Sequence, residues 1–212
     1  MVFAAMENDD LQMLHLRLES DPNIARAKDL NGNSLLLAAI YLGNQDAIDL
    51  LLDSVSSLLA EEAAALGRSD RLVELFDAGE ASVDDLAPDG FGLLHLACMY
   101  GHRETVKMLL DRGASREMVS KHKMKVRPIH SAAAGRKLDI VHLLLDRGAD
   151  VNATQVAGWR LIHHAAQQGN REFVDLLIEH GAEVNVTNDR GQTPADIARG
   201  LRHEDLAEYL ER

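Results

Sequence analysis

The chain alternates between short segments with apolar residues at helical spacing and short polar segments rich in Gly, Asp and Asn. In the segment around Ile140, Leu143 and Leu144, apolar residues recur every three or four positions, which predicts an amphipathic helix. Segments 94–98 and 162–166 carry small residues that let neighbouring helices approach closely. The sequence therefore predicts pairs of short helices, in which a helix with small residues precedes one with a Leu-rich face.

The residue that follows the first helix of each pair recurs at a nearly constant spacing. These residues are Gly43, Gly67, Gly101, Arg136, Gly169 and Arg202, separated by 24, 34, 35, 33 and 33 residues. Glycine suits the end of a helix because it adopts positive φ without steric cost. One helix pair cannot bury its own apolar face, whereas stacked pairs can. The spacing therefore predicts a helical repeat array.

Several segments resemble the ankyrin-repeat family. They read LLHLAC (93–98), PIHSAA (128–133), DRGADVNA (146–153), LIHHAA (161–166) and TPADIA (193–198). The resemblance implies an all-α ankyrin-repeat solenoid, a right-handed stack of helix–turn–helix units joined by short β-hairpin fingers. It also implies a role in binding other proteins, and catalysis is not expected of the repeat itself.

We interpret residues 1–212 as one ankyrin-repeat domain of about seven units. The units span 3–27 (N-terminal cap), 28–53, 54–84, 85–117, 118–152, 153–185 and 186–212 (C-terminal cap). The step from Gly43 to Gly67 is about nine residues short of the repeat length. We expect one hairpin to be missing there, with a local irregularity in the stack.

The charge is uneven along the chain, whose formal net charge is −12. Residues 1–90 carry 5 Lys and Arg against 18 Asp and Glu, a net charge of −13, whereas residues 91–147 carry 11 against 5, a net of +6. An acidic chain with one basic block is not a general nucleic-acid binder, so long nucleic acid is not an expected partner.

Composition also bears on location. No segment has the length of an apolar membrane-spanning helix, and the N-terminus lacks the basic and apolar pattern of a secretory signal. Cys98 is the single cysteine, so an intrachain disulfide is impossible, which fits a reducing compartment. We expect a cytoplasmic, monomeric protein without a cofactor or bound metal.

Two predicted helices begin with an unsuitable residue. Thr193 and Pro194 form the complete Thr-Pro start that the family favours, and Ser34 is an adequate cap. Arg127 and Arg160 occupy the same position in adjacent repeats, yet arginine has no acceptor and its charge opposes the helix dipole. Either they extend into solvent, or together they clamp a carboxylate or phosphate group.

Four of the eight aromatic residues fall where the family resemblance places partner contacts, on finger tips and at the ends of first helices. These are Tyr41, Phe91, Tyr100 and Trp159. Large aromatic residues and arginine dominate binding hot spots, although these rings could instead pack between fingers. The predicted partner-binding residues are Phe91, Met99, Tyr100, Lys123, Met124, Lys125, Arg127, Trp159, Arg160, Gln168 and Arg190.

The basic run 116–127 is predicted to form the finger between the fourth and fifth units. If this finger is extended, alternate residues share a face, which would bring Lys123, Lys125 and Arg127 together. Lys125 stands where other fingers have glycine, so the form of this turn is open. A solvated loop is the alternative interpretation.

Catalytic and metal-binding arrangements find little support in the sequence. His95 and Cys98 lie three residues apart, but His95 matches the family's structural histidine and Cys98 stands where other repeats have Ala. His142 has no second histidine three or four residues away. The sequence contains no Cys-rich zinc motif, phosphate-binding glycine loop or nucleophile elbow.

We therefore expect a soluble adaptor that binds a protein with an acidic and apolar patch on its concave surface of fingers and inner helices. One alternative is an inhibitor whose acidic N-terminal units dock on a basic protein. Another is a binder of a phosphate-bearing ligand through residues 121–127, for which affinity would depend steeply on salt. An enzyme is the least supported class.

Overall fold

The computed structural model describes residues 2–7 and 10–212, which form short helices connected by turns and loops. The described residues contain no β-strand, only two isolated antiparallel bridges, Lys28 with Ser34 and Leu86 with Gly92. The chain divides into two compact parts, unit 1 (residues 1–93) and unit 2 (residues 94–212), which are larger than the single repeats predicted from the sequence. The all-α fold class predicted from the sequence is confirmed.

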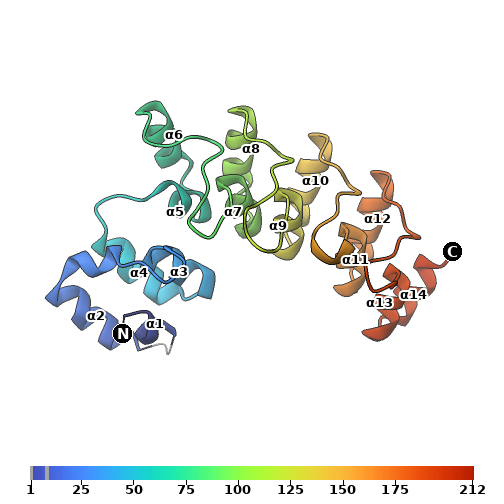
Figure 1. Ribbon diagram of the computed structural model, residues 1–212, viewed down its shortest axis with the longest axis horizontal. Coiled ribbons are helices and arrows are strands. Elements are labelled where there is room, and N and C mark those ends of the chain that lie inside the picture. The colour runs from blue at the N-terminus through green and yellow to red at the C-terminus, as the bar shows by residue number, and fades with distance from the viewer. Residues whose placement is uncertain (1, 8–9) are drawn as a thin grey trace. The chain divides into compact units, whose positions relative to one another are not determined.

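Unit 1 is built from helix pairs that pack through leucine and alanine. Its elements are α1 (Val2–Glu7), α2 (Leu11–Ser20), η1 (Pro22–Arg26), α3 (Leu35–Leu42), α4 (Gln45–Ser54), α5 (Ala60–Ala65) and α6 (Ser69–Asp77) (Figure 1). Helix α3 is buried along most of its length, since Leu35, Leu36 and Leu37 are all 0% exposed. The Ser34 hydroxyl accepts a hydrogen bond from the Leu37 amide at 3.1 Å, as predicted for the cap of this helix.

The short step in unit 1 lies between α4 and α5, which are joined by only residues 55–59 without a finger. The side chain of Glu62 links the residues on either side of this short step and is 0% exposed. Its carboxylate accepts hydrogen bonds from the Leu59 amide at 2.8 Å and the Ser34 hydroxyl at 2.6 Å. Arg26 lies 3.4 Å from the same carboxylate and also donates to the Ser57 carbonyl. A buried charge with this many partners replaces the missing hairpin as a tie between repeats.

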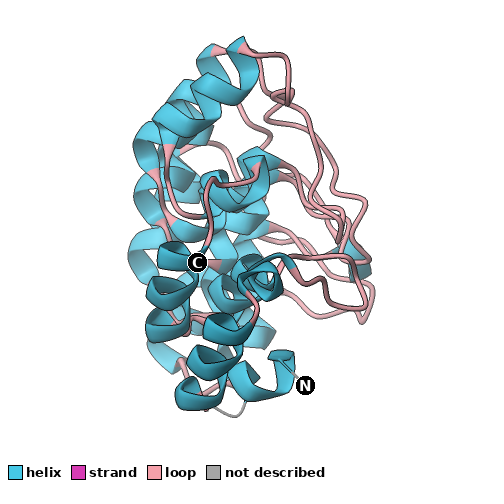
Figure 2. Ribbon diagram, turned by 90° about the vertical axis from the view of Figure 1, so that its left-hand side faces the viewer, coloured by secondary structure: helices cyan, strands magenta, loops and turns pink. Residues whose placement is uncertain are grey.

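Unit 2 repeats one arrangement four times, with a first helix, a turn, a second helix and a loop. Its elements are α7 (Leu93–Tyr100, of which only Leu93 belongs to unit 1), α8 (Arg103–Asp111), α9 (Pro128–Ala134), α10 (Leu138–Asp146), η2 (Val156–Gly158), α11 (Leu161–Gln167), α12 (Arg171–Glu179), α13 (Pro194–Gly200) and α14 (Glu204–Leu210). The finger loops lie on one side of the helices (Figure 2). The core contains Ile140, Leu144 and Phe173, each 0% exposed.

The turn after each first helix confirms the register of the repeat. Gly101 and Gly169 have φ of 82° and 64°, and the equivalent Arg136 and Arg202 have φ of 57° and 65°. The left-handed conformation is thus kept even where the residue is not glycine, at a cost of roughly 1–2 kcal/mol for each arginine.

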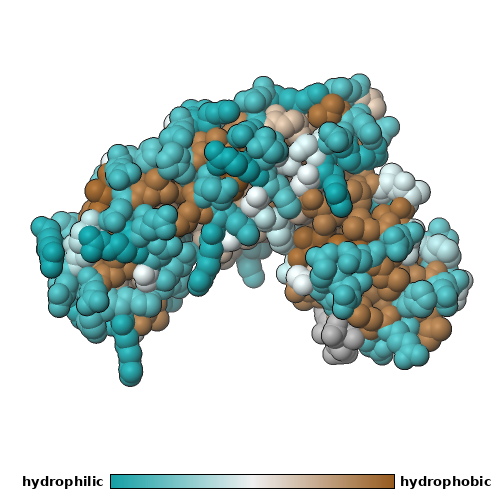
Figure 3. Space-filling model, turned by 180° about the vertical axis from the view of Figure 1, so that it is seen from behind, coloured by the Kyte–Doolittle hydropathy of each residue, from teal (hydrophilic) through white to brown (hydrophobic). Residues whose placement is uncertain are grey.

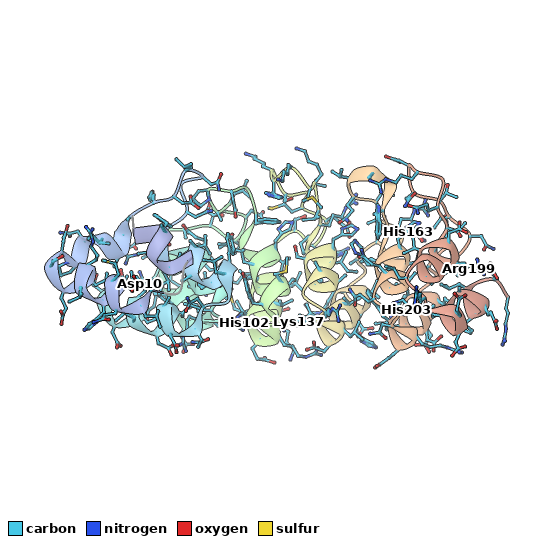
Figure 4. All side chains as sticks on the ribbon, turned by 90° about the horizontal axis from the view of Figure 1, so that it is seen from below. Asp10, His102, Lys137, His163, Arg199 and His203 are labelled. Atoms are coloured by element: carbon cyan, nitrogen blue, oxygen red, sulfur yellow. The ribbon has the colours of Figure 1, made fainter. Side chains whose placement is uncertain are left out.

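Two of these glycines also make room for the next repeat. An added Cβ at Gly101 would lie 2.7 Å from the side chain of Lys137, and one at Gly169 would lie 2.6 Å from the ring of His203. Lys137 and His203 each precede the second helix of the following pair (Figure 4). Close packing therefore requires a small residue at these positions in addition to positive φ.

In the view from behind, hydrophilic side chains cover much of the surface and apolar areas show between them (Figure 3). No helix in the described part of the chain combines the length and apolar character that crossing a bilayer requires.

Candidate protein-interaction surface

The finger tips are closed turns, of which four have the same length and one is longer. In each, a main-chain amide donates to a carbonyl further along the finger at 2.7–3.1 Å. The pairs are Asp29 to Asn33, Ala87 to Phe91, Ser120 to Val126, Gln155 to Trp159, and Asn188 to Gln192. The basic finger, closed by Ser120 and Val126, thus spans two residues more than the others. It is the finger that departs most from the common turn.

Buried histidines of the first helices hold the fingers in place. His130 Nδ1 accepts from the Arg127 amide at 3.2 Å, and its Nε2 donates to the Ala153 carbonyl in the next finger at 3.1 Å. His95 makes the same contact with the Val126 carbonyl at 3.1 Å. Burial lowers the pKa of both imidazoles, that of His130 to about 4, so they are neutral at pH 7. The fingers are therefore preorganised by the helices beneath them.

Arg127 and Arg160 pair with glutamates of their own chain. Arg127 Nε lies 3.1 Å from the Glu117 carboxylate, and its Nη1 donates to the Thr154 carbonyl at 3.3 Å. Arg160 Nη1 lies 2.6 Å from the Glu183 carboxylate. Both arginine side chains are 25% exposed. They tie neighbouring loops together, so an incoming acidic group would have to compete with an internal carboxylate at each position.

Trp159 is half-buried at the end of its finger turn. Its ring lies 5.2 Å from that of His164 and 5.7 Å from that of His163, centroid to centroid. Burial lowers the pKa of His164 to about 4, and its Nε2 lies 2.9 Å from Gln155 Nε2. The indole is thus held against the first helix of its repeat, with part of its surface accessible.

The tip of the basic finger is open to solvent. Lys123 and Lys125 are exposed, as is Met124 with 42% of its surface accessible. Residues 122–125 form a turn, closed by a 2.9 Å hydrogen bond from the Lys125 amide to the His122 carbonyl. The extended form, under which the three cations would share a face, is therefore not the form that this finger takes. Lys125 takes φ of 48° in place of the glycine found in other fingers.

The remaining predicted residues lie on first-helix ends and on two other fingers. Met99, Tyr100 and Gln168 are half-buried, and Gln168 Nε2 donates to the Ala133 carbonyl of the preceding repeat at 2.9 Å. Arg190 is exposed on the last finger. Phe91 belongs to unit 1, at the end of its own finger turn, whereas the other ten predicted residues belong to unit 2.

Unit 1 carries an apolar depression that the list of predicted site residues did not include. It is lined by Phe3 and Met6 of α1, Leu30 of the first finger, and Tyr41 and Leu42 at the end of α3. Leu30 is fully exposed and Leu42 is 52% exposed. An apolar residue at a finger tip and another directly before a turn glycine are the sequence signals that could have revealed this surface.

Cys98 is completely buried, and burial raises the pKa of its thiol far above the usual range. A thiol in this setting remains protonated and shielded from solvent, so it lacks the features of a catalytic nucleophile.

Short helix pairs repeated about every 33 residues, with finger loops on one side, define this chain as a helical repeat protein. The family described as ankyrin repeats (3 copies) matches residues 60–155 and 152–211. The chain belongs to the ankyrin-repeat family. Ankyrin repeats generally mediate protein–protein interaction, and their fold is typically non-enzymatic.

Similar segments occur in much longer proteins. The chain is 44% identical over 63 residues to the ankyrin repeat and KH domain-containing protein mask of Drosophila melanogaster, covering 30% of this chain and 2% of that protein. It is 43% identical over 67 residues to human ankyrin repeat and KH domain-containing protein 1, covering 32% and 3%. Human diacylglycerol kinase iota is 30% identical over 141 residues, covering 63% and 13%. This chain therefore spans a small fraction of these relatives.

Proposed function

We propose that this chain is a protein-binding adaptor that engages its partner through the finger tips and first-helix ends of unit 2. The observation that carries the proposal is the preorganised set of fingers, fixed by His95 and His130, that presents exposed Met124 and half-buried Trp159. A rigid surface loses less entropy on binding than a mobile one.

The chemistry of this surface indicates a partner with an acidic and apolar patch. Lys123 and Lys125 supply exposed positive charge beside Met124 in a part of the chain whose net charge is positive. Arg190 would extend the rim. Arg127 and Arg160 would contribute mainly by holding the fingers, because each already has a carboxylate partner. We also propose that the protein acts as a cytoplasmic monomer.

Capture of partners from a lysate tests this proposal. The key variant is Tyr100→Ala/Trp159→Ala, and Lys123→Glu/Lys125→Glu removes the charge without touching the aromatic residues. Circular dichroism must first show that each variant has wild-type helix content. A protein bound by the wild type and lost from both variants supports the surface, whereas equal capture by all three chains refutes it.

A second candidate is supported by the apolar depression of unit 1. Residues 1–90 are strongly acidic, and Leu30 and Leu42 expose apolar surface among them. This combination suits a basic partner with an apolar anchor. Leu30→Ser/Leu42→Ser should abolish capture in that case, while the variants in unit 2 retain it.

A further inference from the structure

Three second helices of unit 2, α8, α10 and α12, end in a recurring turn in which an acidic residue is followed by arginine or histidine and then by glycine. The turns are Asp111-Arg112-Gly113, Asp146-Arg147-Gly148 and Glu179-His180-Gly181. Adjacent turns are joined through this motif, since Arg147 Nη1 lies 2.9 Å from the Asp111 carboxylate one repeat earlier. In the next repeat the position of Arg147 is occupied by His180.

This exchange creates a cluster of metal-ligand side chains on the outer surface. His142 and Asp146 lie one helical turn apart on α10, and His142 Nδ1 is 2.9 Å from an Asp146 carboxylate oxygen. The rings of His142 and His180 meet edge to face, with centroids 5.7 Å apart. One donor atom from each of the three side chains lies within 4.8 Å of the others.

We propose that His142, Asp146 and His180 form a binding site for a divalent transition metal ion, Zn²⁺ in particular. Two imidazoles and one carboxylate are the donor types that Zn²⁺ accepts, and three protein ligands leave one position for water or for a donor from another molecule. Metal–ligand distances of about 2.0–2.2 Å in tetrahedral geometry put the donor atoms about 3.4 Å apart. The His142–Asp146 pair, at 2.9 Å, would open slightly, and any wider pair in the cluster, up to 4.8 Å, would close. His142 and Asp146 are 54% and 52% exposed, so rotamer changes can provide that adjustment.

The preceding repeat shows why this position differs from its neighbour. The equivalent residues there are Lys107, Asp111 and Arg147, whose two cationic groups have no lone pair to offer a metal. The same backbone arrangement occurs at both positions. Arg147 forms an ion pair with Asp111 at one, whereas His142, Asp146 and His180 supply three possible metal ligands at the other. Replacing His180 with arginine should therefore keep a contact between repeats and remove one metal ligand.

The surroundings of the cluster favour a cation. The groove beside His142, between α10 and α12, is lined by acidic residues of both helices, namely Asp139, Glu172, Asp175 and Glu179. Its two arginines are engaged locally. Arg103 donates to the Asp139 carbonyl at 2.8 Å, and Arg171 lies 3.6 Å from the Asp175 carboxylate.

Titration of the full chain with Zn²⁺ by isothermal calorimetry tests the site. The wild type should bind one Zn²⁺ saturably, and His180→Arg and His142→Gln should each weaken binding by about tenfold or more. His180→Arg restores the pairing seen between Arg147 and Asp111, so its fold should be preserved. Co²⁺ should give the visible absorption of a site with nitrogen and oxygen ligands, which His180→Arg abolishes.

His15→Gln is the matched control, because His15 and Glu19 also form an i,i+4 pair, at 3.3 Å, but the described structure places no second histidine beside them. This variant should bind Zn²⁺ like the wild type. The proposal is overturned if the wild type shows no saturable binding, or if His180→Arg binds Zn²⁺ as tightly as the wild type.

Discussion

Substitution of Glu62 should test whether its buried carboxylate stabilises unit 1 in place of the missing finger. In Glu62→Gln the side chain keeps its size but loses its charge and one of its two acceptor oxygens. The carboxylate now accepts from Ser34 through Oε1 and from Leu59 and Arg26 through Oε2. Whichever way the amide turns, its NH₂ group faces a donor that the carboxylate had satisfied.

The expected loss of stability follows from these contacts. A hydrogen bond to a charged group contributes about 1.5–3 kcal/mol, and a buried donor left without a partner adds a desolvation cost. The Arg26 side chain is 36% exposed, so its ion pair with Glu62 adds little in water. We therefore expect Glu62→Gln to lower the free energy of unfolding by about 2–4 kcal/mol.

Urea unfolding followed by circular dichroism measures the loss, and hydrogen exchange locates it. Amides of α3 and α5 should lose protection while those of α11 and α12 keep theirs. Glu74→Gln is the matched control, because Glu74 pairs with Arg71 at 3.0 Å but is 66% exposed, and it should cost less than about 0.5 kcal/mol. If Glu62→Gln is no less stable than Glu74→Gln, the buried carboxylate does not replace the missing finger.

Three further outcomes follow from the structure of unit 2. The pKa values of His130 and His164 are lowered to about 4, so the folded chain binds fewer protons than the unfolded chain between pH 6.5 and 4. The melting temperature of the chain should fall as pH decreases through that range, and it should fall less in His164→Gln. A melting temperature that does not change with pH would refute the lowered pKa values. Gly135→Ala would place a Cβ 2.0 Å from the Met99 carbonyl oxygen, so it should destabilise the chain by about 1–3 kcal/mol in urea unfolding. Arg136→Gly removes a left-handed arginine and should raise stability by a few tenths to 1 kcal/mol, and a loss instead would show that the Arg136 side chain outweighs the strain.

Much of the fold was predictable because its causes are local and repeated. The turn positions recur about every 33 residues, and Arg136 and Arg202 adopt the same left-handed backbone as their glycine equivalents. Ser34 and Thr193 cap their helices through hydrogen bonds to the backbone three residues on, which sequence spacing alone specifies. Apolar spacing likewise fixes which face of each helix is buried.

Side-chain pairing between repeats could not be obtained in the same way. Sequence analysis recognised Arg127 and Arg160 as unusual but could not assign Glu117 and Glu183 as their partners. The form of the basic finger was left open by the sequence, and only the structure shows that Lys125 takes the positive φ of the glycine it replaces. Such choices depend on distances of a few ångströms between loops, which the repeat period does not specify.

The sequence by itself determined the repeat, its register, its helix ends and its uneven charge, because each of these depends on residues close together along the chain. Only the tertiary structure decided that Glu62 is buried among three donors and that His180 meets His142 from the next repeat. Both depend on how helices pack across repeats. Packing sets which side chains meet and which donor and acceptor atoms remain to be satisfied, and a linear pattern carries no such distances.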